Sequence, residues 1–196
     1  MKSSAIRVPM VMASLLALAS PALADSWQVD PSHSDVGFSV PHMMISRVKG
    51  EFKEFSGKAE IDDKNLTRSQ VTFEVKVASV DTDEAKRDEH LRGGDFFDAE
   101  KYPLMVFKST KVRRAGKGYK VTGDLTLHGV TKPVTLAVTL TKPIQTPFGT
   151  TARGVSATGV IKRKDFGMTW NNTLDAGGLM VGEEVEIQVE LELVKQ

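Results

Sequence analysis

Four histidines carry the side chains best suited to metal or acid–base chemistry: His33, His42, His90 and His128. No two of them stand four residues apart on an expected helix, and none has a carboxylate at a spacing typical of a metal site. His33 and His42 flank one apolar strand and could meet at the mouth of a barrel. We expect no metal, favour a loop-capping role for His33, and keep His42 as a candidate contact for the polar head of a ligand.

The residue pattern does not support nucleophilic catalysis. The sequence has no Gly-x-Ser-x-Gly motif and no cysteine, which disfavours serine-hydrolase and thiolate mechanisms. Ser34 follows His33 directly, and neighbouring side chains on a strand point to opposite faces. Residues 87–90, Arg-Asp-Glu-His, have types used in acid–base catalysis, but their helical spacing favours a solvated or barrel-capping charge cluster. We therefore expect no enzyme activity and no catalytic cofactor.

The first 24 residues predict a cleaved secretory signal peptide. Lys2 and Arg7 precede an apolar run, and Ala22-Leu23-Ala24 places small residues where a signal peptidase cuts. Cleavage would leave residues 25–196 as one domain and change the formal net charge from +1 to −1. Such a balanced chain offers no basic field for nucleic acid. The signal and the absence of cysteine lead us to expect a bacterial periplasmic protein that is stabilised by its core.

The elements that must position any site are mostly strands. Apolar and polar residues alternate with period two, as in Val71, Phe73 and Val75, and turn residues separate the runs. Around Phe52 and Phe55 the alternation slips, which predicts a bulge or bend. A short extra pairing over 26–30 is also compatible with the pattern. The main predicted strands cover residues 34–40, 48–62, 69–80, 104–114, 118–128, 132–142, 151–163 and 182–195.

This pattern predicts an all-β protein, an eight-stranded antiparallel barrel with one short helical segment near 83–92. A barrel of this size can be filled by side chains or can hold one small ligand. Pro41 is expected to end its strand and to place Met43, Met44 and Ile45 on an irregular lip. Methionine suits a flexible apolar ligand, although core filling is the simpler explanation for any single one. Periodicity alone does not separate a solid core from a cavity.

Several motifs together resemble the YceI-like family, in order and over nearly all of the chain from Trp27 to Leu193. The matching segments are 30–34 (DPSHS), 87–91 (RDEHL), 95–98 (DFFD), 123–134 (GDLTLHGVTKPV), 163–168 (RKDFGM) and 181–185 (VGEEV). The resemblance implies an exported, lipocalin-like barrel whose cavity binds an apolar chain. The expected ligand is a polyisoprenoid, such as an isoprenoid quinone or polyprenyl lipid, or a fatty-acid derivative.

Given this resemblance, the candidate ligand contacts are residues on the apolar strand faces and on the lip. They are Val36, Phe38, Val40, His42, Met43, Met44, Ile45, Phe52, Phe73, Phe107, Phe166, Met168 and Trp170.

The main hypothesis is a periplasmic carrier of an isoprenoid lipid. The alternatives are a quinone-linked redox accessory of a membrane cytochrome, and a stress-response protein whose bound lipid is incidental. The sequence leaves the oligomeric state open and is compatible with transient contact with a membrane or a membrane protein.

Overall fold

The structure is a computed structural model that describes residues 24–174 and 177–196. The predicted signal peptide lies outside the described residues, except for Ala24, and its cleavage stays a prediction. The strands, in chain order, are β1 (Asp25–His42), β2 (Ser46–Phe52), β3 (Phe55–Ile61), β4 (Gln70–Lys76), β5 (Val80–Asp81), β6 (Leu104–Ala115), β7 (Gly118–Leu127), β8 (Val130–Leu140), β9 (Ile144–Gln145), β10 (Thr151–Lys162) and β11 (Glu184–Lys195). The helical elements are α1 (Ala85–Arg92) and the 3₁₀ turns η1 (Leu66–Arg68), η2 (Val77–Ser79) and η3 (Arg163–Phe166).

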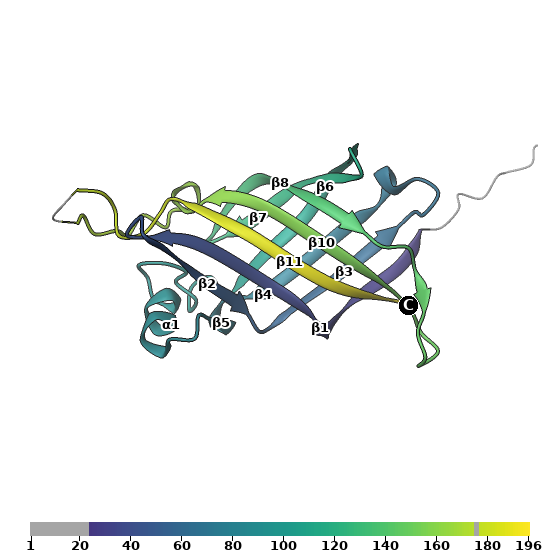
Figure 1. The fold of residues 1–196 in the computed structure, drawn as a ribbon, viewed down its shortest axis with the longest axis horizontal. Coiled ribbons are helices and arrows are strands. Elements are labelled where there is room, and N and C mark those ends of the chain that lie inside the picture. Colours follow the sequence, from purple (N-terminus) through teal and green to yellow (C-terminus); the bar gives the residue numbers. More distant parts are fainter. Residues whose placement is uncertain (1–23, 175–176) are drawn as a thin grey trace, which may run out of the picture.

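These strands close into an antiparallel barrel (Figure 1). From β11 the hydrogen-bonded order runs through β10, β8, β7, β6, β4 and β3 to β1, and β1 pairs with β11 to close the ring. β2 and β3 both pair with β1, at opposite ends of it, and so form the two halves of one bent strand. Counted in this way the barrel has eight strands, which confirms the predicted fold.

The bend predicted near Phe52 and Phe55 lies between β2 and β3. Beyond it, β3 pairs with β4, whereas β2 pairs with the short β5. The predicted strand 69–80 therefore ends as β4 at Lys76 and continues as η2 and β5.

The prediction that Pro41 ends its strand is wrong. β1 runs on to His42, with Pro41 opposite Arg47 of β2. Proline lacks only a hydrogen-bond donor, and its carbonyl accepts a bond of 2.8 Å from the Gly182 amide. The extra pairing expected at 26–30 is part of the same strand, with a register shift between Asp30 and Asp35.

The predicted helical segment is confirmed as α1, which lies at one end of the barrel (Figure 1). The Glu84 carboxylate caps it by accepting from the amides of Lys86 and Arg87. The helix is attached to the wall by its own side chains. Buried Asp88 accepts from the Thr82 amide at 2.9 Å, and the Arg92 guanidinium donates to the carbonyls of Ala78 and Val80. These bonds fix α1 to the barrel wall at that end.

The interior contains three apolar clusters. The first, at the end that holds the C-terminus, consists of Trp27, Val29, Ala59, Ile61 and Leu193. The second surrounds Val36, Phe52 and Val80, and the third surrounds Leu125, Leu127 and Phe166. Among the described residues, the helices are too short and too polar to cross a membrane.

Candidate ligand-binding cavity

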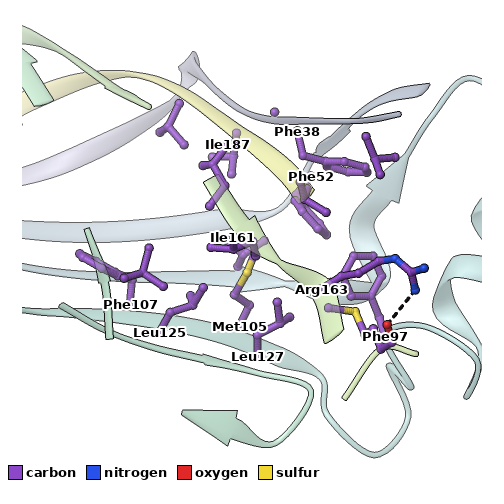
Figure 2. Close-up of a pocket in the computed structure, with 18 of the residues that line it drawn as sticks. Phe38, Phe52, Phe97, Met105, Phe107, Leu125, Leu127, Ile161, Arg163 and Ile187 are labelled. Carbon is purple, nitrogen blue, oxygen red and sulfur yellow. Dashed lines mark hydrogen bonds between the residues drawn. The ribbon is translucent and has the colours of Figure 1, made fainter. Parts of the chain in front are cut away.

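The second and third clusters do not fill the barrel, and a cavity of about 380 Å³ lies between them (Figure 2). Side chains from nearly every long strand point into it, among them Phe107 of β6, Leu125 of β7 and Ile187 of β11. Its lining is apolar except for Gly37, His42, Arg87, His90 and Arg163. Toward the C-terminal end it stops at Val71, Val155 and Leu191, which pack against the first cluster. The cavity is therefore a pocket with a floor.

Glycines opposite the cavity phenylalanines keep the space open. Phe38 faces Gly50 across the β1–β2 ladder, and Phe73 faces Gly57 across the β3–β4 ladder. A Cβ on Gly50 would lie 2.5 Å from Phe38 Cζ, and one on Gly57 would lie 2.5 Å from Phe73 Cδ2. Both distances are far below a van der Waals contact, so each ring rests in the place of a missing side chain. The large rings thus line the wall without crossing the cavity.

Arg163 anchors the open end of the barrel. Although it is only 3% exposed, its guanidinium donates to the carbonyls of Gly182 (2.8 Å), Met168 (2.7 Å), Trp170 (2.8 Å) and Val181 (3.3 Å). One of these bonds is drawn in Figure 2. Burial lowers the pKa of this guanidinium, and nearby Glu183 opposes the change. Arginine has so high an ordinary pKa that the side chain is charged at neutral pH. Its bonds connect the residues after η3 with the residues before β11 and so form a fixed backbone frame around the mouth.

Three rings from separate segments meet beside this frame. The His90 ring lies edge-on to Phe96 and to Trp170, with centroid distances of 5.0 and 4.9 Å. His90 Nε2 lies 2.9 Å from an oxygen of Asp95. His90 lines the cavity while its side chain is 44% exposed, so the cavity reaches solvent here. Next to it, the Arg87 guanidinium donates to the hydroxyl and the carbonyl of Thr82, both at 2.7 Å.

The structure brings nine of the predicted contact residues together on the cavity wall. They are Val36, Phe38, Val40, His42, Phe52, Phe73, Phe107, Met168 and Trp170. That each touches a ligand stays a prediction.

The other four predicted residues do not line the cavity. Met44 and Ile45, in the turn after β1, are 74% and 84% exposed. Met43 sits in the same turn, with its amide bonded to the Met180 carbonyl at 2.8 Å. Phe166 is 2% exposed and packs into the third cluster.

Sequence reasoning missed much of the wall that faces these residues. Leu125 and Ile187 sit on apolar faces that the alternation identifies, so extending the same parity to every strand would have found them. Arg163 offers no such signal, because its role depends on carbonyls from two distant segments. Arg87 was considered only as part of a charge cluster, whereas in the structure its partner is Thr82.

The histidines do not meet as the sequence suggested. His42 lies at the mouth, opposite Val181, whereas His33 lies on the outside of the barrel at the register shift of β1. Although no histidine has a carboxylate at a sequence spacing typical of a metal site, the fold brings His33 Nδ1 within 2.9 Å of Asp30 Oδ2. Glu192 completes a group whose ligand atoms lie within 4.8 Å of one another.

These contacts are consistent with the loop-capping role favoured for His33. Asp30 also accepts from the Ser32 amide at 2.9 Å, so the short segment folds back on its own carboxylate. The Ser34 hydroxyl donates to the Asp30 carbonyl and accepts from the Glu192 amide, and it is therefore not directed at the imidazole. The fourth histidine, His128, contacts the Phe166 carbonyl through its Nδ1 at 3.0 Å.

The closed barrel and its internal apolar pocket define a lipocalin-like architecture with room for one ligand. The model of the YceI-like domain matches residues 27–193, and the chain belongs to this family. A UPF0312 protein from Photorhabdus laumondii is 41% identical over 184 residues, which cover 93% of each chain.

Solved structures share the fold. BcnA from Burkholderia cenocepacia superposes with a TM-score of 0.74 at 28% identity, over 84% of this chain and 98% of its own. A polyisoprenoid-binding domain from Saccharophagus degradans, implicated in plant cell wall breakdown, superposes with a TM-score of 0.61 at 17% identity. The latter match covers 89% of this chain and 99% of that domain, and at this identity it supports the fold alone.

Proposed function

We propose that this protein is a non-enzymatic binding protein that carries one long apolar lipid, a polyisoprenoid, in its barrel. The observation that carries the proposal is the internal cavity, whose lining is apolar along its length and polar only at the mouth. A volume of about 380 Å³ lies near the lower end of the usual range for small-molecule sites and gives room for part of a long chain rather than for all of it. A domain that shares this fold is a polyisoprenoid-binding domain, and we take the proposed ligand class from that likeness in fold.

The distribution of polar groups suggests the orientation of the lipid. Arg87, His90 and His42 lie at the open end, whereas Val71 and Val155 form the floor. If the apolar chain of the ligand points toward this floor, it contacts only apolar side chains and leaves no polar atom buried without a hydrogen-bond partner. We propose that the chain enters first and that its polar head stays among the mouth residues.

Energetics favour a carrier over permanent capture. A chain of roughly 40 heavy atoms at about −0.3 kcal/mol per atom would gain on the order of −12 kcal/mol on transfer from water. A membrane lipid, however, is already out of water, so its net transfer into the barrel is close to zero. Loading and unloading are then both accessible. Together with the predicted signal peptide, this supports a periplasmic carrier, and an isoprenoid quinone is one ligand that fits.

The direct test is to purify the exported protein without detergent, extract it with organic solvent, and identify the extract by mass spectrometry. We expect about one long-chain isoprenoid lipid per folded protein. An extract with no lipid, from protein whose β content is confirmed by circular dichroism, would contradict the proposal.

A matched pair of variants on β11 locates the ligand. Ile187 lines the cavity, and Gln188, the next residue, is exposed on the outer face. Ile187→Asp places an unpaired carboxylate in an apolar wall and should remove the lipid, whereas Gln188→Asp should leave lipid content unchanged. Phe38→Asp, in register with Ile187 on β1, should behave like Ile187→Asp. Full lipid content in folded Ile187→Asp protein would show that the ligand lies elsewhere.

A further inference from the structure

The cavity mouth is bordered by two loops that we call the rim: the turn at 43–45 between β1 and β2, and residues 171–174 and 177–182 before β11. Backbone hydrogen bonds join them, from the Met43 amide to the Met180 carbonyl and from the Gly182 amide to the Pro41 carbonyl, both at 2.8 Å. A further bond of 2.9 Å links the Met180 amide to the Asn172 carbonyl. In Figure 1 these loops project beyond the barrel at the end that carries α1.

The rim exposes large apolar side chains that contribute nothing to the core. Ile45 is 84% exposed, Met44 74% and Leu179 37%. Met43 and Met44 have φ values of 51° and 60°, a left-handed conformation that non-glycine residues rarely adopt. The turn therefore holds apolar side chains in water by means of a strained backbone, which is typical of a functional surface.

The charges around the rim indicate what kind of surface it fits. The sequence has no charged residue over 41–46, and over 171–182 it has only Asp175, which lies outside the described residues. Two flanking basic residues are paired with carboxylates: Arg47 contacts Glu186 at 3.0 Å, and Lys164 contacts Glu183. The rim thus lacks the basic residues that attract anionic lipids or acidic proteins.

From these observations we propose that the rim docks the cavity mouth on the uncharged surface of a lipid bilayer. The inference rests on the proposed function, because it names the partner from which the cavity receives its lipid. Bilayer entry requires paired backbone groups, and the bonds between the two loops supply part of that pairing. His42, Met180 and Val181 belong to the rim segments or adjoin them and also line the cavity. A lipid could therefore pass from bilayer to barrel along a continuous apolar path.

The opposite end of the barrel supplies a matched control. Phe148 is 91% exposed and Ile144 is 64% exposed, beside the short β9 strand and away from the cavity. If exposed apolar area alone caused membrane binding, Ile144 and Phe148 would contribute at least as much to it as Met44 and Ile45 of the rim. The proposal predicts that only Met44 and Ile45 contribute to vesicle binding.

The experiment is co-sedimentation of the full mature protein with phosphatidylcholine vesicles, with and without added phosphatidylglycerol. Met44→Ser combined with Ile45→Ser should weaken binding by at least about tenfold, because the loss of even one large apolar side chain from a lipid contact has an effect of this size. Ile144→Ser combined with Phe148→Ser should bind like the unmodified protein. Added phosphatidylglycerol should not strengthen binding.

Three results would overturn the proposal. The first is loss of binding only in the variant with Ile144→Ser and Phe148→Ser, and the second is binding that rises with phosphatidylglycerol and falls with salt. The third is no vesicle binding by the unmodified protein together with a dimer that Met44→Ser and Ile45→Ser abolish. The last would identify the rim as a contact between copies of the chain. Lipid extraction tests the carrier function separately. Vesicle binding by a protein that contains no lipid would leave the docking surface standing and remove the carrier proposal.

Discussion

The two ends of the barrel interior are built from similar residue types, but one end is filled by side chains and the other is hollow. At the closed end, Trp27 is 1% exposed and packs with Val29, Ala59, Ile61 and Leu193 into a solid plug. At the open end, Trp170 is half-buried and borders a cavity. Each end has one tryptophan and one buried arginine. A filled end and a hollow end thus arise from arrangement rather than from residue type.

The two buried arginines show the difference most clearly. Arg153 and Arg163 are 4% and 3% exposed, ten positions apart along the β10–η3 segment. Arg163 donates hydrogen bonds to four backbone carbonyls and so organises the loops of the mouth. Arg153 stacks on Trp27 at 4.9 Å and bonds Asp63 at 2.9 Å, but its Nε and Nη1 have no partner within the part of the chain that the structure describes. Arg163 acts through hydrogen bonds, whereas Arg153 acts mainly as a cover for the plug.

The largest expected effect comes from breaking the plug. Trp27→Ala should lower the free energy of unfolding by about 3–5 kcal/mol, because it leaves a large cavity in a packed cluster. Trp170→Ala removes a half-buried ring at the mouth and should cost about 1 kcal/mol. Urea unfolding followed by circular dichroism measures both values. Equal losses would mean that the two ends are equally packed.

The arginines give the next largest difference. Arg163→Met should destabilise the fold by about 3 kcal/mol, since it leaves several buried carbonyls without a donor. Arg153→Met should change stability by less than about 1 kcal/mol in either direction, because it removes a buried charge that is only partly paired. Thermal and urea unfolding measure the stability of both variants. A larger loss for Arg153→Met would refute the contrast between the two sites.

A smaller change tests why the open end is hollow. Gly50→Ala places a methyl group where Phe38 now lies and should push that ring into the cavity. We expect lower lipid content per folded protein and a stability loss of about 1–3 kcal/mol. Gly94→Ala is the control, because a Cβ there meets nothing within 4 Å. Unchanged lipid content in Gly50→Ala would show that Phe38 does not limit the space.

The smallest effect belongs to the outer surface. The hydrogen bond to Asp30 raises the pKa of His33 above its ordinary value of 6.5, and the same bond lowers the pKa of Asp30 below 3.8. The imidazolium therefore contributes stability that is complete below about pH 6.5 and is lost as pH rises through the raised pKa. His33→Gln should flatten the stability difference between about pH 6 and pH 8 and leave lipid content unchanged. A change in lipid content would connect this exposed pair to the interior.

The fold was largely predictable because strand signals are local. Side-chain direction alternates along each strand, so the runs around Val71 and Leu125 identify their inward faces without any partner. The slip between Phe52 and Phe55 likewise located the bend between β2 and β3. The local rule for proline was misleading at Pro41, because this residue still pairs with Arg47 of β2 and its carbonyl accepts a bond from Gly182, far along the chain.

What the sequence by itself determined is which residues face inward; the tertiary structure alone decided whether the space between them is filled. Val29 and Val36 lie on the same strand, yet Val29 belongs to the plug and Val36 to the cavity wall. The difference depends on what faces each of them across the barrel, and on Gly50 and Gly57 beside Phe38 and Phe73. A cavity is a relation among strands that are distant in sequence, and local alternation carries no information about the side chains on the opposite wall.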